Sequence, residues 1–469
     1  RPREHRRRRA RRRASPEPVP LLVFAPEAVR PCSPDIPAHR RKSVVRSGEI
    51  KALTGLRIIA AVWVVLFHFR PLLRLASPEF SDALAPVLDR GAQGVDLFFI
   101  LSGFVLTWNY LERMGESFSA RATVHFLWLR LARVWPIYLV TMHLALLWVI
   151  FTLHVGHVPT EDLSRITAIN YVRQVLLVQL WFEPFFDGSS WDGPAWSISA
   201  EWLAYLLFGL MILLIFRMAT VTRARTLLML AFVASLPPTI LLLASGHFYT
   251  PWSWLPRILM QFTAGALACA AVRRLRPSHQ TRVLAGVAAA AIVAASVSLL
   301  YVLDAHPLHD VIDSGGVVDL LFMPLVVALA IGVGTLPRLL ATRAIVYGGQ
   351  ISFCLYMLHE LVHTSWNWAA RQFDLTLTGG PGKLIVAGLF ALCLLLVASS
   401  WALAQQALSV PKLTQYVTDQ AGIFDSAQRR ASERPARRGI VRRTVPSRGL
   451  TTSLICRARP ERTRTRERT

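Results

Sequence analysis

The stretch LTGLRIIAAVWVVLFHF, residues 53–69, decides the class of this chain. It is long and apolar enough to predict a membrane-spanning helix, and Arg57 and His68 are its only ionisable side chains. On an α-helix their offset of eleven residues is close to three full turns, so both side chains share one face about 16 Å apart. Ionisable groups within a membrane are costly and mark functional sites by default, so this pair is the first candidate site.

Nine further apolar stretches follow the first one. The chain has 469 residues and is 53% hydrophobic but only 17% charged. The ten stretches lie at residues 53–69, 94–111, 134–153, 195–216, 226–245, 254–272, 283–303, 316–335, 345–366 and 384–408. Runs of this length predict an all-α, polytopic integral membrane protein with about ten transmembrane helices.

Two basic tails flank the predicted transmembrane domain. Most of the net charge of +24 lies in residues 1–51 and 412–469, which are rich in Arg, Pro and Ser. We therefore predict three regions: a disordered tail at 1–50, the membrane domain at 51–410 and a second disordered tail at 411–469. The tails favour contact with anionic membrane lipid over nucleic acid. The sequence begins with Arg1 and has no Met before Met114, so we expect the native start to differ.

The connections between the stretches predict the orientation. With the amino terminus inside, the inner connections carry thirteen Lys and Arg residues and the outer ones seven. The positive-inside rule then predicts a multi-pass protein of the plasma membrane with both termini in the cytoplasm. Within the longest connection, residues 163–181 are amphipathic, with Arg165, Arg173 and Gln174 on a polar stripe, which predicts an interfacial or re-entrant helix on the outer face.

The cysteines predict neither a disulfide framework nor a metal knuckle. They are scattered, form no CxxC pair, and three lie within apolar stretches, which is typical of packing. The five are Cys32, Cys269, Cys354, Cys393 and Cys456.

His68 is predicted to lie near the middle of the membrane or slightly beyond it, and Arg57 near the cytoplasmic surface. A neutral imidazole at that depth could act as a general base on an alcohol, or could simply join two helices by a hydrogen bond. Arg130 and Arg133, three residues apart at the inner mouth of the third stretch, share a face. With Arg57 they could bind the phosphates of a cytosolic cosubstrate, although topology alone also places arginines there.

Two acids enter the membrane from the outer side at similar predicted depths. Asp96 lies about one turn into the second stretch, and Glu201 about two turns into the fourth. They could orient His68 or hold the hydroxyls of an acceptor; a buried structural pair with an arginine is the alternative.

The ninth stretch places His359 in its outer half, within the string HELVH. Its HExxH pattern is also that of a zinc metalloprotease helix, with His363 as the second imidazole. Zinc needs a third ligand, and the one later stretch, 384–408, contains no Asp, Glu or His. We therefore predict no metal.

Five blocks occur along the chain: LTGLRIIAAVWVVLFHF, GVDLFFILSGF, RLAR, PAWSISAEWLAYLLF and ISFCLYMLH. In this order they resemble the acyltransferase 3 family of multi-span membrane enzymes, over roughly residues 50–410. That family moves acyl groups from coenzyme A onto cell-surface glycans or small exported molecules. The resemblance implies a stand-alone O-acyltransferase of the EC 2.3.1 type.

The resemblance also implies site residues. It implies that Arg57 and His68 are an essential pair. In the second block, it points to Asp96 and Ser102. The predicted site consists of His68, Glu201, His359 and Asp96 as catalytic residues, Arg57, Arg130 and Arg133 as ligands of acyl-CoA, and Trp196, Ser197 and Tyr356 as substrate-binding residues. Three positions depart from the family pattern: Thr54 replaces the usual aspartate, Leu361 a frequent proline, and Ser409 a glutamate near the end of the last stretch.

These observations together predict a mechanism. Acyl-CoA, most simply acetyl-CoA, docks from the cytosol as a cosubstrate, with its phosphates on the three arginines and its pantetheine arm running toward His68. His68 then acts as general base on a hydroxyl of a carbohydrate or glycosylated small molecule, or takes the acyl group itself. A transporter or flippase, in which the same charges form a path without covalent chemistry, is the alternative. A membrane-bound acyltransferase of the other large histidine-using class is a further one.

Overall fold

The computed structural model describes residues 48–155, 166–308, 311–373, 380–389 and 391–393. Nine helical segments in this part are long and apolar enough to cross a membrane. They are α1 (Lys51–Ala76), η1 with α3 (Gly91–Gln93 and Gly94–Met114), α4 (Ala120–His154), α6 (Ala195–Val221), α7 (Ala224–Ser245), α8 (Trp254–Arg274), α9 (His279–Ala305), η3 with α10 (Ser314–Leu321 and Phe322–Ile331) and α12 (Arg343–Gln372). Three shorter helices connect them: α2 (Pro78–Leu88), α5 (Ala168–Val175) and α11 (Thr335–Leu340).

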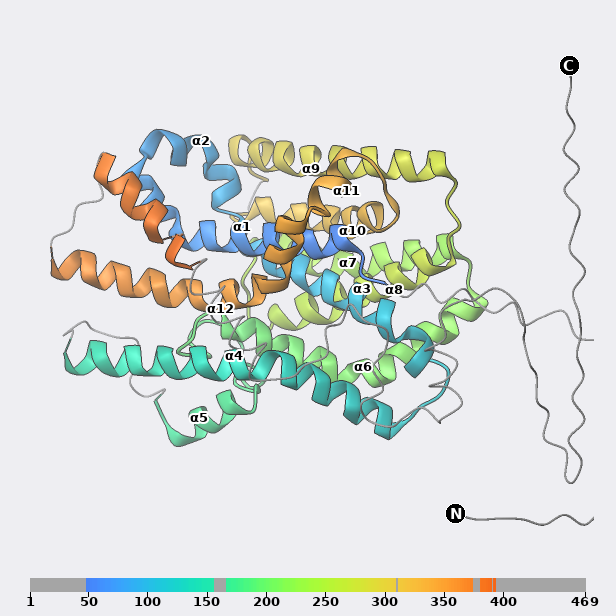
Figure 1. Ribbon diagram of the computed structural model, residues 1–469, viewed down its shortest axis with the longest axis horizontal. Coiled ribbons are helices and arrows are strands. Elements are labelled where there is room, and N and C mark those ends of the chain that lie inside the picture. Colours follow the sequence, from blue (N-terminus) through green and yellow to red (C-terminus); the bar gives the residue numbers. More distant parts are fainter. Residues whose placement is uncertain (1–47, 156–165, 309–310, 374–379, 390, 394–469) are drawn as a thin grey trace, which may run out of the picture. The chain divides into compact units, whose positions relative to one another are not determined.

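The predicted all-α membrane architecture is therefore confirmed. The long helices lie side by side along a common direction, and α1 runs next to α12 (Figure 1). The predicted tenth stretch, 384–408, falls largely outside the described residues, although an apolar helix occupies Gly380–Cys393. Residues 1–47 and 394–469, which include most of both predicted tails, also lie outside them.

The third span begins much earlier than predicted. Helix α4 starts at Ala120 rather than near residue 134, and the Ser119 side chain caps it by accepting a hydrogen bond from the backbone N–H of Ala122. Arg130 and Arg133 therefore lie about 15 and 20 Å from the start of the helix. The apolar residues on both sides of these arginines belong to the same 35-residue helix.

The amphipathic connection is helical over a shorter range than predicted. Residues 163–165 lie outside the described part, and α5 covers only Ala168–Val175. Its apolar side chains Ile169 and Val172 are exposed, whereas Gln174 is buried and accepts a hydrogen bond from Ser190. The polar side of this segment thus faces the helix bundle and the apolar side faces outward, as an interfacial helix requires.

Two glycine contacts bring helices unusually close. A Cβ atom on Gly103 of α3 would lie 1.9 Å from the backbone oxygen of Phe262 in α8. A Cβ atom on Gly349 of α12 would lie 1.8 Å from the backbone oxygen of Thr54 in α1. Small residues at helix crossings allow such close packing in membranes. These contacts fix the two helix pairs that carry the ionisable side chains described below.

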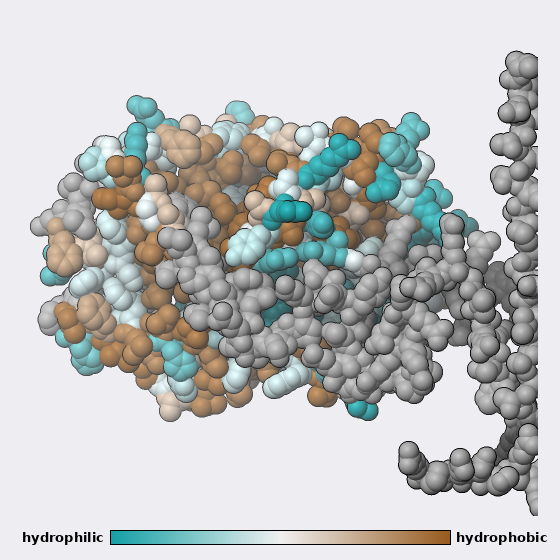
Figure 2. Space-filling view, viewed as in Figure 1, coloured by the Kyte–Doolittle hydropathy of each residue, from teal (hydrophilic) through white to brown (hydrophobic). Residues whose placement is uncertain are grey.

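The outer surface of the bundle is apolar. Leu210, Val221 and Met229 are among many exposed large hydrophobic side chains. The visible face is largely hydrophobic, with hydrophilic side chains gathered near its middle and its right-hand end (Figure 2). Cys269, Cys354 and Cys393 are buried and free, which confirms the packing role predicted for them; Cys32 and Cys456 lie outside the described residues.

Candidate functional site

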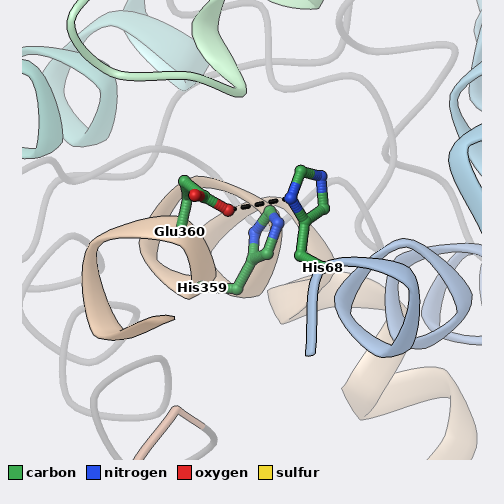
Figure 3. Close-up of side chains that lie close together, drawn as sticks. All are labelled: His68, His359 and Glu360. Atoms are coloured by element: carbon green, nitrogen blue, oxygen red, sulfur yellow. Dashed lines mark ion pairs between the residues drawn. The ribbon is translucent and has the colours of Figure 1, made fainter. Parts of the chain in front are cut away.

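His68 meets a carboxylate from α12. The His68 Nδ1 atom lies 2.9 Å from the Glu360 Oε2 atom, and the rings of His68 and His359 make an edge contact with centroids 4.9 Å apart. Figure 3 shows His68 approaching from α1 while His359 and Glu360 project from α12. The His68 side chain keeps 34% of its surface exposed, so one edge of the ring stays accessible. The three side chains form a cluster that we call the histidine cluster.

His359 is oriented by its own helix. Its Nδ1 atom lies 2.6 Å from the Tyr356 backbone oxygen, so Nδ1 carries the proton and donates it. The Nε2 atom is then an acceptor, and it is buried with no hydrogen-bond partner among the residues that the structure describes. The Tyr356 hydroxyl is bonded to Ser197 at 2.8 Å and donates to the Pro194 backbone oxygen at 3.1 Å. Two residues predicted to bind substrate therefore join α6 to α12 next to His359.

The HExxH string does not form a zinc metalloprotease site. His363 Nδ1 lies 3.4 Å from Glu360 Oε1, and His363 Nε2 lies 3.0 Å from the Asn367 side-chain nitrogen. Both ring nitrogens of His363 are thus engaged by protein groups, which leaves none for a metal. His68, His359 and Glu360 offer a different set, because one ligand atom from each lies within 4.8 Å of the others. By chemistry, two imidazoles and one carboxylate could hold a divalent ion.

Asp96 forms a buried pair with Arg257 of α8. The Asp96 oxygens accept hydrogen bonds from Arg257 Nε at 3.0 Å and Nη2 at 2.7 Å, and both side chains are almost fully buried. The guanidinium also lies 5.3 Å from the ring centroid of Trp196 and 4.3 Å from that of Phe248. The structural pair with an arginine, one of the two sequence-based interpretations of Asp96, is therefore what the geometry shows. The carboxylate on His68 belongs to Glu360 instead.

Glu201 lies further along the helix bundle than Asp96, so the predicted similar level of the two acids is wrong. Its carboxylate accepts a hydrogen bond from Ser102. Because Ser102 follows Asp96 by six residues on α3, Glu201 sits about 9 Å further along that helix. Glu201 thus belongs to another group of charges.

The three predicted acyl-CoA ligands come together around Glu201. Arg133 interacts electrostatically with Arg57, Arg130 and Glu201, and Arg130 lines a small pocket with Glu201. We call Arg57, Arg130 and Arg133 the arginine group. Among the described residues none of the three forms an ion pair, and the Nε atoms of Arg57 and Arg130 are buried without a hydrogen-bond partner. Positive charge therefore exceeds negative charge here.

The arginine group instead uses aromatic neighbours. Arg57 lies 5.6 Å from the ring centroid of Phe98, and Arg130 lies 5.7 Å from that of Tyr110 and 5.8 Å from that of Phe126. Such cation–π contacts stabilise a guanidinium only modestly and leave its N–H donors available. The group is suited to receive an anion.

A buried carboxylate in the loop before α6 borders the histidine cluster. Burial raises the pKa of Asp192 to about 7; a hydrogen bond from Thr141 opposes this shift, and the nearby charge of Glu360 adds to it. In the same loop, Gly193 lies against the Glu360 side chain. This loop therefore closes one side of the histidine cluster.

The sequence-based site omits three residues that the structure brings forward: Glu360, Arg257 and Asp319. Glu360 enters the sequence analysis only as part of the HExxH string. Asp319 of η3 is buried, and within the described part of the chain neither of its carboxylate oxygens has a hydrogen-bond partner. An ionisable residue within an apolar stretch is itself a signal, and it could have identified Arg257 and Asp319.

Comparison with known proteins identifies the family of the chain. Residues 50–405 match the model of an acyltransferase domain family. Acyltransferase MdmB of Streptomyces mycarofaciens is 31% identical over 162 residues, which are 34% of this chain and 39% of that protein. Protein 2 in the picA locus of Rhizobium radiobacter is 29% identical over 206 residues, which are 42% of this chain and 94% of that protein.

The chain aligns with well under half of MdmB, and no solved structure matches it. The family match, in contrast, extends over most of the chain and includes the histidine cluster, the arginine group and the Asp96–Arg257 pair. The predicted family is thereby confirmed: this multi-pass membrane protein belongs to the acyltransferase domain family.

Proposed function

We propose that the protein is a membrane O-acyltransferase that moves an acyl group, acetyl in the simplest case, from cytosolic acyl-CoA to a hydroxyl group. The acceptor is a cell-surface glycan or a glycosylated small molecule destined for export. One observation carries the proposal: Arg57, a member of an arginine group that forms no ion pair among the described residues, and His68, an accessible histidine beside a carboxylate, lie on the same helix, α1, about 16 Å apart.

The arginine group would bind the phosphates of coenzyme A. Guanidinium groups bind phosphate through two parallel hydrogen bonds, and three of them with one nearby carboxylate leave positive charge for an anion. The pantetheine arm, comparable in extended length to the spacing on α1, would carry the thioester to His68. Both termini in the cytoplasm would place the arginine group toward the cytosolic supply of acyl-CoA.

His68 would act as the general base. Its Nε2 atom takes the proton of the acceptor hydroxyl while the oxygen attacks the thioester carbonyl carbon. The carbon–sulfur bond then breaks, and the coenzyme A sulfur takes the proton back from the imidazolium. The products are an ester of the acceptor and free coenzyme A, and His68 is restored. Tyr356 lies beside His359 and is bonded to Ser197, and the neighbouring Trp196 lies against Arg257. These three residues would shape the acceptor end of the site.

The experiment uses membranes from cells that express the wild-type chain or the His68→Ala variant. Radiolabelled acetyl-CoA is supplied to the cytoplasmic face, and the label in alkali-labile products of the same membranes and extracts is counted. We expect incorporation by the wild type and a loss of about 10²- to 10⁴-fold in the variant.

A histidine elsewhere in the membrane provides the control. His143 lies on α4 and bonds to the Leu139 backbone oxygen and to Tyr171. His143→Ala should therefore keep wild-type incorporation. Absence of labelled ester from wild-type membranes, with flux of an unmodified solute instead, would favour a transporter and reject the proposal.

A further inference from the structure

We propose that Glu360 is the positioning residue of His68: it holds the imidazole in the tautomer whose Nε2 lone pair faces the reacting groups. The inference rests on the proposed function of His68 as general base. The contact that carries it is the 2.9 Å approach of Glu360 Oε2 to His68 Nδ1. An ionised carboxylate accepts hydrogen bonds only, so Nδ1 must carry the proton and Nε2 must be free to accept one.

The hydrogen bonds around Glu360 all point in consistent directions. Asn367 presents its side-chain nitrogen to His363 Nε2 at 3.0 Å, so this nitrogen accepts and the proton of His363 lies on Nδ1. His363 Nδ1 then donates to Glu360 Oε1 at 3.4 Å. Glu360 Oε1 therefore receives the N–H of His363, and Glu360 Oε2 lies at ion-pair distance from His68 Nδ1.

The helix packing builds this arrangement into the fold. His68 lies seventeen residues after the first residue of α1, and Glu360 lies seventeen residues after the first residue of α12. The close contact of Gly349 with Thr54 holds the two helices together along this length. The rings of Phe69 and His363 also meet, with centroids 5.3 Å apart. His68 and Glu360 are thus brought to the same depth by two helices in direct contact.

The chemical consequence concerns both stages of the reaction. Before proton transfer, Glu360 excludes the tautomer whose Nε2 carries a hydrogen, because that form would turn a lone pair toward a carboxylate. After proton transfer, the imidazolium remains beside the negative charge of Glu360, which stabilises it. His359 cannot replace His68 in this role, because it is fully buried and lacks a carboxylate partner on Nδ1.

The decisive variant is Glu360→Gln. A glutamine must turn its NH₂ group toward one of the two imidazole Nδ1 atoms that lie beside the carboxylate, so that imidazole has to change tautomer. We expect kcat to fall by about 10²- to 10⁴-fold while KM for acetyl-CoA changes by less than about threefold, as for a residue that acts on the base alone. Glu360→Asp, which keeps the charge on a shorter side chain, should recover part of kcat.

A double-variant cycle separates positioning from a general structural role. If Glu360 acts through His68, then Glu360→Gln should cost nothing further in the His68→Ala background, because residues that act as a unit are not additive. Glu183→Gln is the matched control: this carboxylate lies 4.0 Å from Arg173, away from the histidine cluster, and its variant should keep wild-type kcat.

The outcomes distinguish this inference from the proposed function. A wild-type protein that makes no acyl ester rejects the proposed function. An active wild type whose Glu360→Gln variant stays within about threefold of its kcat, or loses the same factor with and without His68, rejects the role of Glu360 alone. Stoichiometric zinc or another divalent ion in the purified wild type, lost in Glu360→Gln, would also reject it, since His68 and Glu360 would then be ligands.

Discussion

The Asp96–Arg257 pair and the arginine group both place guanidinium groups inside the helix bundle, but only the first is neutralised. Asp96 accepts two hydrogen bonds from Arg257. Arg57, Arg130 and Arg133 repel one another and have Glu201 as their nearby acid. A buried charge inside a membrane therefore marks either a structural tie or a binding site, and the state of its hydrogen bonds distinguishes the two.

The largest expected effect concerns the structural tie. Arg257→Ala leaves Asp96 buried without its cation, and we expect the free energy of unfolding to fall by about 3 to 5 kcal/mol. Thermal unfolding of the purified protein in detergent measures this loss. Arg257→Lys keeps the charge but not the two-point hydrogen bond, so its melting temperature should lie between those of the wild type and Arg257→Ala. A melting temperature of Arg257→Ala equal to that of the wild type would contradict the structural role of the Asp96–Arg257 pair.

The next effect concerns the arginine group and should appear in binding rather than in stability. Arg130→Ala/Arg133→Ala removes two mutually repelling cations, so the melting temperature should stay the same or rise. We expect KM for acyl-CoA to increase by about 10- to 100-fold, because each hydrogen bond to a charged group contributes about 1.5 to 3 kcal/mol. Steady-state kinetics with varied acetyl-CoA measures it.

Arg121 offers a control for that double variant, because it is exposed near the start of the same helix. Arg121→Ala should leave KM unchanged. If the double variant also leaves KM unchanged, the arginine group does not bind the cosubstrate.

The smallest effect concerns Asp192, a buried acid that forms no ion pair within the described part of the chain. Its pKa is raised to about 7 by burial, opposed by the hydrogen bond from Thr141 and increased by Glu360; Tyr138 and Tyr356 also face it. The folded state thus binds a proton that the unfolded state has released, so stability falls as pH rises from about 4 to 7. Asp192→Asn should remove this dependence.

If the two proteins are about equally stable at pH 5, we expect Asp192→Asn to be more stable than the wild type by about 2 to 3 kcal/mol at pH 8. Melting temperatures of both proteins between pH 5 and 8 provide the comparison. A constant difference across this range would show that Asp192 is ionised throughout.

The positions of the spans could be predicted from the sequence, because hydropathy over 18 or more residues dominates every local preference in a membrane. The start of α4 could not, since Arg130 and Arg133 interrupt the apolar pattern without ending the helix. The shared face of Arg57 and His68 followed from helical geometry alone. The meeting of His68 with Glu360 did not, because it depends on which helices pack together, and no local pattern encodes the contact of α1 with α12.

The missing side chain of Gly349 has a mechanical consequence. A methyl group there would press on the Thr54 carbonyl and wedge α12 away from α1. Because an α-helix is stiff, the displacement would be transmitted to Glu360, eleven residues and about 16 Å further along. A substitution at position 349 would thus change the distance between Glu360 and the His68 imidazole, although residue 349 contacts neither of them.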